Sequence, residues 1–287
     1  MTESFGTRLT AAVAARGGLC VGIDPHPRLL ADWGLPFDAA GLERFALTCV
    51  EAFADEVSVV KPQSAFFEAH GARGIAVLER VISQSRQAGS LVLLDVKRGD
   101  VGSTMAAYAA AYLGDSSPLA ADAITLSPYL GLAALEPALE LAERTGRGVF
   151  LLALTSNPDG ATVQRAVTGD GHSVAQRIAH AAGRRNAGVR PLGSVGLVVG
   201  ATTHDATLDL SGVNGPILAP GLGAQGATVA DLRHVFGAVL PSVLPVSARE
   251  ILRHGPEPAA LRSAALATRD AVAALLTDTS TDASTRA

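Results

Sequence analysis

Short apolar runs recur along this chain, and segments of helical periodicity separate them. A nearly continuous apolar run of this length predicts a strand that is buried on both faces, as in a parallel sheet. Eight such runs are present: 19–24, 57–62, 91–97, 123–128, 148–156, 195–202, 216–221 and 243–248. The segments between them, such as 37–56 and 173–187, carry apolar residues at helical spacing with charged residues on the other side. Strands and helices therefore alternate along the chain.

Eight strand–helix units in about 250 residues are typical of a (β/α)8 TIM barrel. We therefore predict an α/β fold with a single domain, an eight-stranded parallel barrel over residues 1–276. The polar, small residues of 277–287 predict a disordered tail. In this fold the functional site lies where the strands end, at the C-terminal face of the barrel.

Polar residues follow nearly every predicted strand. They are Asp24, Lys61, Asp95, Lys97, Ser127, Ser156, Thr202, Gln225, Ser247 and Arg249. Strands often end in polar residues because loops begin there, so this pattern alone does not establish a site. The types of residue are more informative, because charged groups of both signs gather at these ends.

The two lysines, Lys61 and Lys97, are the only ones in the chain, which has 21 arginines. An ammonium can give up a proton, whereas a guanidinium in a protein cannot. Asp95 shares a strand face with Lys97, and Asp100 follows in the next loop. Carboxylates on both sides favour a protonated Lys97, which predicts a proton donor and not a Schiff-base nucleophile. An ion-pair network that only closes the barrel would give the same pattern.

The loop 220–226, PGLGAQG, matches the G-x-G-x-x-G pattern of dinucleotide-binding proteins. Only about sixty residues follow it, too few for the rest of a Rossmann domain. In a barrel the same loop predicts a phosphate site after the seventh strand, with Gly223 and Gly226 letting the backbone approach the anion. Arg249, just after the last strand, could complete that site with a planar, two-pronged contact.

Composition and charge narrow the class of protein. A net charge of −4 without a basic stripe argues against binding to nucleic acid, and no apolar run is long enough to span a bilayer. Two cysteines, Cys20 and Cys49, suit a reducing compartment and offer no disulfide framework. The seven histidines are scattered without metal-ligand spacing. We expect a cytoplasmic protein that binds no metal.

The motifs above resemble those of the orotidine 5'-phosphate decarboxylase family. LDVKRGD (94–100) resembles its Asp-x-Lys-x-x-Asp signature, and VGIDP (21–25) its aspartate after strand one. KPQSAFFE (61–68) resembles its lysine after strand two, and PGLGAQG with Arg249 its phosphate site. The resemblance extends from about residue 18 to 250. KPQSAFFE and the long loop after strand five are similar to the longer bacterial group of the family.

The resemblance implies a decarboxylation of orotidine 5'-phosphate (OMP) to UMP and CO2 in pyrimidine biosynthesis, with no cofactor and with Lys97 as the proton donor to C6. The implied catalytic residues are Lys61, Asp95, Lys97 and Asp100. The implied substrate-binding residues are Asp24 and Lys61 at the ribose, Ser156 at the pyrimidine, Gln225, Arg249, Gly223 and Gly226 at the phosphate, and Thr104. The resemblance also implies a homodimer in which Asp100 and Thr104 act across the interface.

Two alternatives remain open. Sugar-phosphate decarboxylases of the same superfamily resemble this chain but use Mg²⁺, and in them we expect an acidic ligand at the end of strand two, where this chain has Lys61. A non-catalytic barrel that binds a phosphate ligand could lose part of the charged set, which this chain keeps. The loops after strands five and seven are both candidates to close over the substrate.

Overall fold

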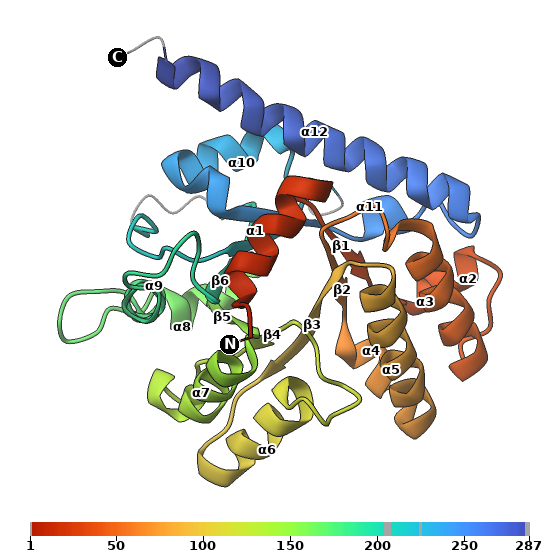
Figure 1. The fold of residues 1–287 in the computed structure, drawn as a ribbon, viewed down its shortest axis with the longest axis horizontal. Helices are drawn as coiled ribbons and strands as arrows, with labels where there is room; N and C mark the ends of the chain where they lie inside the picture. The colour runs from red at the N-terminus through yellow and green to blue at the C-terminus, as the bar shows by residue number, and fades with distance from the viewer. Residues whose placement is uncertain (1, 204–207, 224–225, 285–287) are drawn as a thin grey trace.

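Eight parallel strands form a closed barrel in the computed structural model, which describes residues 2–203, 208–223 and 226–284. The strands follow one another around the barrel in sequence order, and β8 pairs with β1 to close it (Figure 1). Their bounds are β1 (Cys20–Ile23), β2 (Val59–Pro62), β3 (Leu91–Arg98), β4 (Ala123–Leu126), β5 (Gly148–Leu154), β6 (Val195–Val199), β7 (Ile217–Pro220) and β8 (Val243–Ser247). Seven of them lie within a predicted run and β3 extends one residue beyond its own, so the predicted (β/α)8 barrel is confirmed.

Helices surround the barrel and separate its strands as the sequence predicts, except that the described residues between β6 and β7 form no helix; one helix also precedes the first strand. They are α1 (Phe5–Arg16), α2 (Pro27–Asp32), α3 (Ala39–Phe53), α4 (Ser64–Glu68), α5 (Gly71–Gln87), α6 (Gly102–Leu113), α7 (Glu136–Thr145), α8 (Ala161–Gln164), α9 (Val174–Arg185), α10 (Val229–Phe236), α11 (Arg249–Leu252) and α12 (Pro258–Ser284), with short 3-10 turns at Leu132–Leu135, Pro158–Gly160 and Gly237–Ser242. Helix α12 passes along one side of the barrel and reaches into 277–287 (Figure 1). The disorder predicted for 277–287 stays a prediction.

The inside of the barrel is filled by apolar side chains from its strands. The cluster contains Cys20, Val59, Leu93, Ala123, Phe150, Val198, Leu218, Leu244 and Val246. Helix α1 lies across the middle of the ring of strands and adds Phe5 and Leu9 to this cluster (Figure 1). The ring of Phe5 meets that of Phe150 edge to face, with 5.9 Å between centroids. Helix α1 therefore closes the N-terminal end of the barrel.

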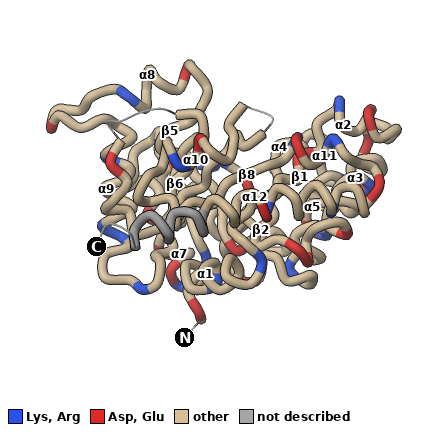
Figure 2. The backbone as a smooth tube through the Cα atoms, turned by 90° about the horizontal axis from the view of Figure 1, so that it is seen from above, with Lys and Arg blue, Asp and Glu red and all other residues tan. Residues whose placement is uncertain are grey.

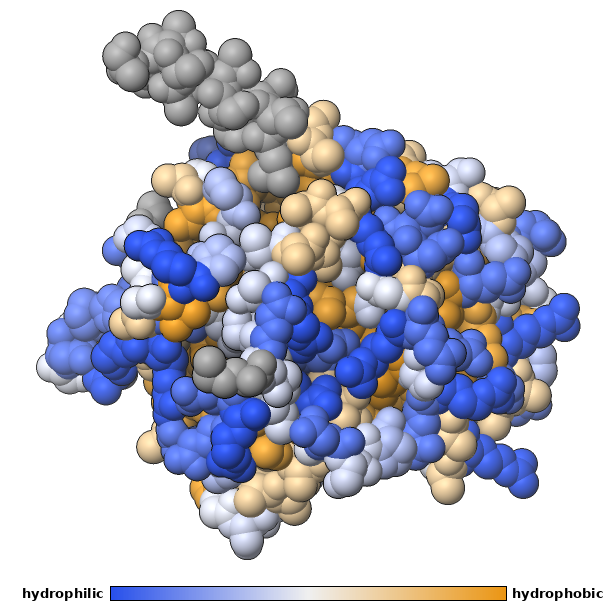
Figure 3. All heavy atoms as spheres, viewed as in Figure 1, coloured by the Kyte–Doolittle hydropathy of each residue, from blue (hydrophilic) through white to orange (hydrophobic). Residues whose placement is uncertain are grey.

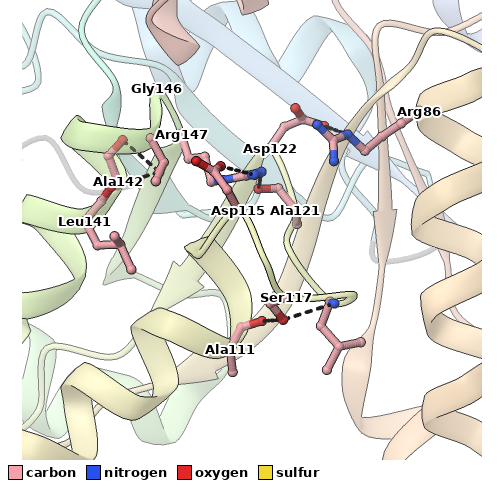
Figure 4. A network of polar contacts seen from close by, with 12 residues as sticks. Arg86, Ala111, Asp115, Ser117, Ala121, Asp122, Leu141, Ala142, Gly146 and Arg147 are labelled. Atoms are coloured by element: carbon pink, nitrogen blue, oxygen red, sulfur yellow. Dashed lines mark hydrogen bonds and ion pairs between the residues drawn. The ribbon is translucent and has the colours of Figure 1, made fainter. Parts of the chain in front are cut away.

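A polar network fixes this closed end (Figure 4). Asp122, just before β4, is buried and accepts hydrogen bonds from Arg8 Nη1 of α1 at 2.5 Å and from the Val92 backbone N–H at 3.0 Å. Arg86 Nε of α5 lies 3.5 Å from the second oxygen of the same carboxylate. Nearby, the buried Arg147 donates to the carbonyl of Ala121. A buried carboxylate needs such partners, so the network ties α1 to the barrel.

The outer surface carries charges of both signs, spread over the whole fold (Figure 2). Hydrophilic residues cover most of the face that carries α1, with smaller hydrophobic areas between them (Figure 3). Across the described residues, no helix is both long enough and apolar enough to cross a membrane.

We expect Phe5→Ala to lower the free energy of unfolding by about 3–5 kcal/mol, because it empties a fully buried ring site at the end of the barrel. Urea unfolding measures this change. Phe37→Ala is the matched control, since Phe37 is 60% exposed and its loss should cost less than about 0.5 kcal/mol. A decrease in the free energy of unfolding for Phe5→Ala as small as that for Phe37→Ala would show that the Phe5 ring of α1 does not stabilise the barrel.

Candidate active site

A cavity of about 290 Å³ opens at the C-terminal ends of the strands, opposite the end that α1 closes. Its polar lining residues are Asp24, Lys61, Gln63, Asp95, Lys97, Thr125, Thr155, Ser156, Asn157 and Arg249. Leu152, Val198, Leu218, Leu222 and Val246 provide apolar walls. The charged residues predicted from the sequence therefore meet an apolar surface, on which a flat ring can rest while polar groups fix its orientation.

Asp95 lies at the centre of the charged groups in this cavity. Its Oδ1 is 2.6 Å from Nζ of Lys97, and its Oδ2 is 3.1 Å from Nζ of Lys61. Lys61 Nζ also lies 3.9 Å from Oδ1 of Asp24. Strands β1, β2 and β3 are neighbours in the barrel, so their ends bring these groups together. Carboxylates and ammonium groups therefore alternate from Asp24 to Lys97.

Burial and charge act in opposite directions on these groups. Burial alone would raise the pKa of Asp95, but the ammonium groups of Lys61 and Lys97 outweigh it and hold that pKa well below its usual range. Burial would lower the pKa of Lys61, but the carboxylates of Asp95 and Asp24 outweigh it and hold that pKa above its usual value. Asp95 and Lys61 are therefore both charged at neutral pH.

Asp24 differs from Asp95 because its buried Oδ1 has no hydrogen-bond donor and its ion pair with Lys61 is long. Burial raises its pKa above the usual value, against the opposing effect of Lys61. Its Oδ1 is buried and accepts no hydrogen bond from the protein. An unsatisfied carboxylate oxygen at the edge of a cavity is a strong acceptor for a ligand hydroxyl.

Lys97 has an unusual backbone conformation. Its φ is +45°, in the left-handed region, and the pairing of β3 with β4 shifts register between Leu94 and Arg98. A residue with a Cβ pays about 1–2 kcal/mol for this conformation. Such strain persists where the surrounding structure holds it, and it is common at functional sites. The shift turns the Lys97 side chain into the cavity beside Asp95, with 44% of that side chain still exposed.

Thr125 of β4 is a site residue that the sequence analysis missed. Its hydroxyl donates to Asp95 Oδ1 at 2.7 Å and accepts from the Lys97 backbone N–H at 2.9 Å. One buried side chain thus orients both the central carboxylate and the lysine backbone. The apolar run AITL concealed it, because threonine is an ordinary strand residue.

Gln63 is a second missed residue, two positions after Lys61. Its amide nitrogen lies 3.4 Å from the Asp95 carbonyl oxygen, and its amide oxygen lies 3.5 Å from Lys61 Nζ. Both contacts are long, but they place the amide at the wall of the cavity. Its spacing of two residues from Lys61, just past the end of β2, was the signal that could have identified it.

The predicted phosphate site is brought together in part. Gly221 and Leu222 line the cavity, as does Arg249 at the start of α11. Gly223 and Gly226 have φ of +79° and +93°, values that favour glycine, but they lie outside the cavity lining. Gln225 lies outside the described residues, so its predicted contact cannot be placed.

The other predicted residues divide between the cavity and the surface. Ser156 lines the cavity. Asp100 does not contribute to the lining within one chain; its Oδ1 accepts from the Val101 backbone N–H at 2.8 Å. Thr104 is exposed on α6. The role predicted for Asp100 and Thr104 in a neighbouring subunit stays a prediction.

No group of three or more histidine, cysteine, aspartate or glutamate side chains is arranged to hold a metal in the described part of the chain. At the end of β2, where the magnesium-dependent alternative needs an acidic ligand, Lys61 makes its ion pair with Asp95.

Several known proteins are similar to this chain. The orotidine 5'-phosphate decarboxylase of Salinispora arenicola is 66% identical over 263 residues, which are 92% of this chain and 95% of the relative. The protein of the same name from Streptomyces coelicolor is 60% identical over 264 residues, with the same coverage of both chains.

Solved structures show the same fold. A crystal structure from Streptomyces avermitilis has a TM-score of 0.94 and 56% identity, and covers 96% of this chain and 97% of its own. The structure of Leishmania donovani OMP decarboxylase has a TM-score of 0.73 and 31% identity, and the match covers 95% of this chain and 98% of that one.

The family model described as "Orotidine 5'-phosphate decarboxylase / HUMPS family" matches residues 17–264. This range contains all eight strands and every described cavity residue. The resemblance seen in the sequence motifs is therefore confirmed, and the chain belongs to the orotidine 5'-phosphate decarboxylase / HUMPS family.

Proposed function

We propose that this chain is an orotidine 5'-phosphate decarboxylase, which converts OMP to UMP and CO2 without a metal or organic cofactor, as a step of pyrimidine biosynthesis. The observation that carries the proposal is the buried Asp95 carboxylate between the ammonium groups of Lys61 and Lys97, at 3.1 and 2.6 Å. The names of the relatives at 60–66% identity support the same activity.

The reaction breaks the bond between C6 of the pyrimidine and its carboxylate. The electron pair of that bond stays on C6, in the plane of the ring, where the ring cannot delocalise it as an enolate. Fixed positive charge can stabilise such a carbanion, because an ammonium held in place needs no reorganisation as the charge develops. In this proposal the Lys97 ammonium provides that charge and then donates a proton from Nζ to C6, which gives UMP and a neutral amine.

Asp95 acts in two ways in the proposed mechanism. It holds the Lys97 ammonium at 2.6 Å, so that the proton donor is aimed before the substrate enters. In the proposed complex the substrate carboxylate binds next to the negative charge of Asp95. The repulsion between the two carboxylates is relieved as CO2 leaves. Thr125 and Lys61 keep Asp95 in place and ionised through their contacts with its two oxygens.

Substrate binding involves groups away from the reacting carbon. The unsatisfied Oδ1 of Asp24 is suited to a ribose hydroxyl, with Lys61 beside it. Ser156 is proposed to contact the pyrimidine, and Arg249 the phosphate, together with Gln225 and the backbone of the 220–226 loop. Binding energy from the phosphate can order the site around a reacting carbon that the phosphate never touches.

We propose a homodimer in which Asp100 and Thr104 of one chain reach the site of the other. Exposed apolar residues near this region support the proposal: Val101, before α6, is 56% exposed, and Tyr129 and Leu130, after β4, are 76% and 53% exposed. Exposed apolar residues mark protein–protein contacts where they form one contiguous patch. A cytoplasmic location belongs to the same proposal, since the thiols of Cys20 and Cys49 are unpaired.

Wild-type protein should consume OMP in the presence of EDTA, and Lys97→Ala should lower kcat/KM by at least about 1,000-fold, because it removes both the proton donor and the stabilising charge. The fall in OMP absorbance measures the reaction. Arg80→Ala, an exposed cation on α5, is the control and should keep full activity. Wild-type protein that ignores OMP but acts on sugar phosphates once Mg²⁺ is added would instead support the magnesium-dependent alternative.

Mixed dimers test the shared site. Refolding equal amounts of Lys97→Ala and Asp100→Ala chains together should restore about one quarter of wild-type activity, because half of the dimers then contain one complete site. A mixture of Lys97→Ala and Lys61→Ala chains is the control. Those two lysines serve the same site within one chain, so this mixture should stay inactive. The absence of rescue in the first mixture would rule out the contribution of Asp100 across the interface.

Stability should depend on pH through Asp95. A carboxyl whose pKa is lowered by folding stabilises the protein above its ordinary pKa, near 4, and this contribution is lost as the pH falls. The stability of wild type relative to Asp95→Asn should therefore decrease between pH 7 and pH 2 by on the order of 2 kcal/mol. Urea unfolding at several pH values measures this, with Asp32→Asn on the surface as the control for loss of one carboxyl. A difference that does not change with pH would contradict the charged Asp95.

A further inference from the structure

The peptide unit between Val96 and Lys97 is held at both of its polar atoms. Its N–H, on Lys97, donates to the hydroxyl of Thr125 on the inner side of the barrel at 2.9 Å. Its carbonyl, on Val96, accepts from Nη1 of Arg98 at 3.2 Å. The orientation of this peptide relative to the Cα of Lys97 defines the φ of Lys97. Holding both atoms restrains one side of this torsion and so helps to keep φ at its strained value of +45°.

The side chain of Arg98 is itself fixed by helices outside the barrel. Nη2 donates to Oε1 of Glu68 at 2.5 Å, at the end of α4. The same nitrogen lies 3.3 Å from the hydroxyl of Tyr112 on α6. The guanidinium also lies over the rings of Tyr108 and Tyr112, with 5.5 and 5.8 Å to their centroids. These contacts leave Arg98 little freedom to release the Val96 carbonyl.

Glu68 is held in turn by the element that follows Lys61. Its Oε1 also accepts from the buried hydroxyl of Ser64 at 2.6 Å. Ser64 begins α4, directly after Gln63 and three residues after Lys61. The contact between Arg98 and Glu68 thus joins the ends of β2 and β3, the two strands that carry the lysines of the cavity. The side chains of Ser64, Glu68 and Arg98 do not line the cavity.

We propose that Arg98, anchored by Glu68, is a positioning residue that keeps the Lys97 ammonium aimed at the reacting carbon. Without the anchor, the Val96–Lys97 peptide turns toward an ordinary extended conformation and Lys97 leaves its place beside Asp95. A lysine cannot replace Arg98, because only the planar guanidinium donates to the Val96 carbonyl and to Glu68 from two nitrogens at once.

The kinetic test rests on the proposed OMP decarboxylation. We expect Glu68→Gln and Arg98→Lys each to lower kcat about 10- to 100-fold, as a misplaced catalytic group does, with KM for OMP changed less than about threefold. The double variant should be no worse than the more impaired single variant, because the two residues act through one contact. Glu43→Gln, which breaks the exposed pair with Arg80 between α3 and α5, is the control and should keep its kcat.

A second readout does not need activity. The chain has two lysines, so protein labelled with 13C at lysine Cε gives two lysine NMR signals, which Lys97→Ala assigns. Glu68→Gln should shift or broaden the Lys97 signal and leave that of Lys61 in place, while Glu43→Gln changes neither. This result would stand even if the wild-type protein did not act on OMP, which separates the inference from the proposed function.

Other results would overturn the inference. One is an unchanged Lys97 signal in Glu68→Gln. Another is a lower unfolding temperature with unchanged kcat per folded molecule, which would make the contact purely structural. If Arg98→Lys does not fold, Glu68→Gln decides, because glutamine keeps the shape of a side chain that is 35% exposed.

Discussion

The site depends on a single carboxylate that is surrounded by positive charge. Asp95 is buried at the end of β3, where an unpaired anion would be expensive, and the ammonium groups of Lys61 and Lys97 make its ionised form the stable one. The dependence is mutual, because Asp95 and Asp24 also keep Lys61 charged despite its burial. Removing any one of these charges leaves its partners unbalanced at the buried strand ends, which costs stability.

The barrel makes this concentration of charge possible because apolar packing and the charged side chains lie at opposite ends of it. One end is filled with apolar side chains and closed by α1, which supplies Phe5 and Arg8, one of the partners of Asp122. The other end carries the charged side chains, and the free energy that they cost is balanced by the packing below them. Parallel strands bring this about because all eight end at the same face, whatever helices connect them.

The sequence predicted the strands well, because each is a compact apolar run and a closed parallel barrel leaves no edge strand to confuse the pattern. It also predicted the charged side chains at the strand ends, since lysine is rare in this chain. It could not predict Thr125 or the contact between Arg98 and Glu68. Thr125 acts through a register shift between β3 and β4, and Arg98 and Glu68 are thirty residues apart on different elements. Sequence spacing within one strand carries no information about such contacts.

The closing of the barrel by α1 has a consequence for how the chain folds. Helix α1 precedes its partners along the chain: Phe150, whose ring it meets, lies in β5, and Asp122, which pairs with Arg8, lies just before β4. The first strand likewise cannot complete its pairing until β8 exists. Helix α1 therefore cannot complete these contacts until the chain has been synthesised through Phe150. Contacts between such distant parts of a chain form slowly, so Phe5 and Leu9 of α1 stay exposed to solvent until those partners exist.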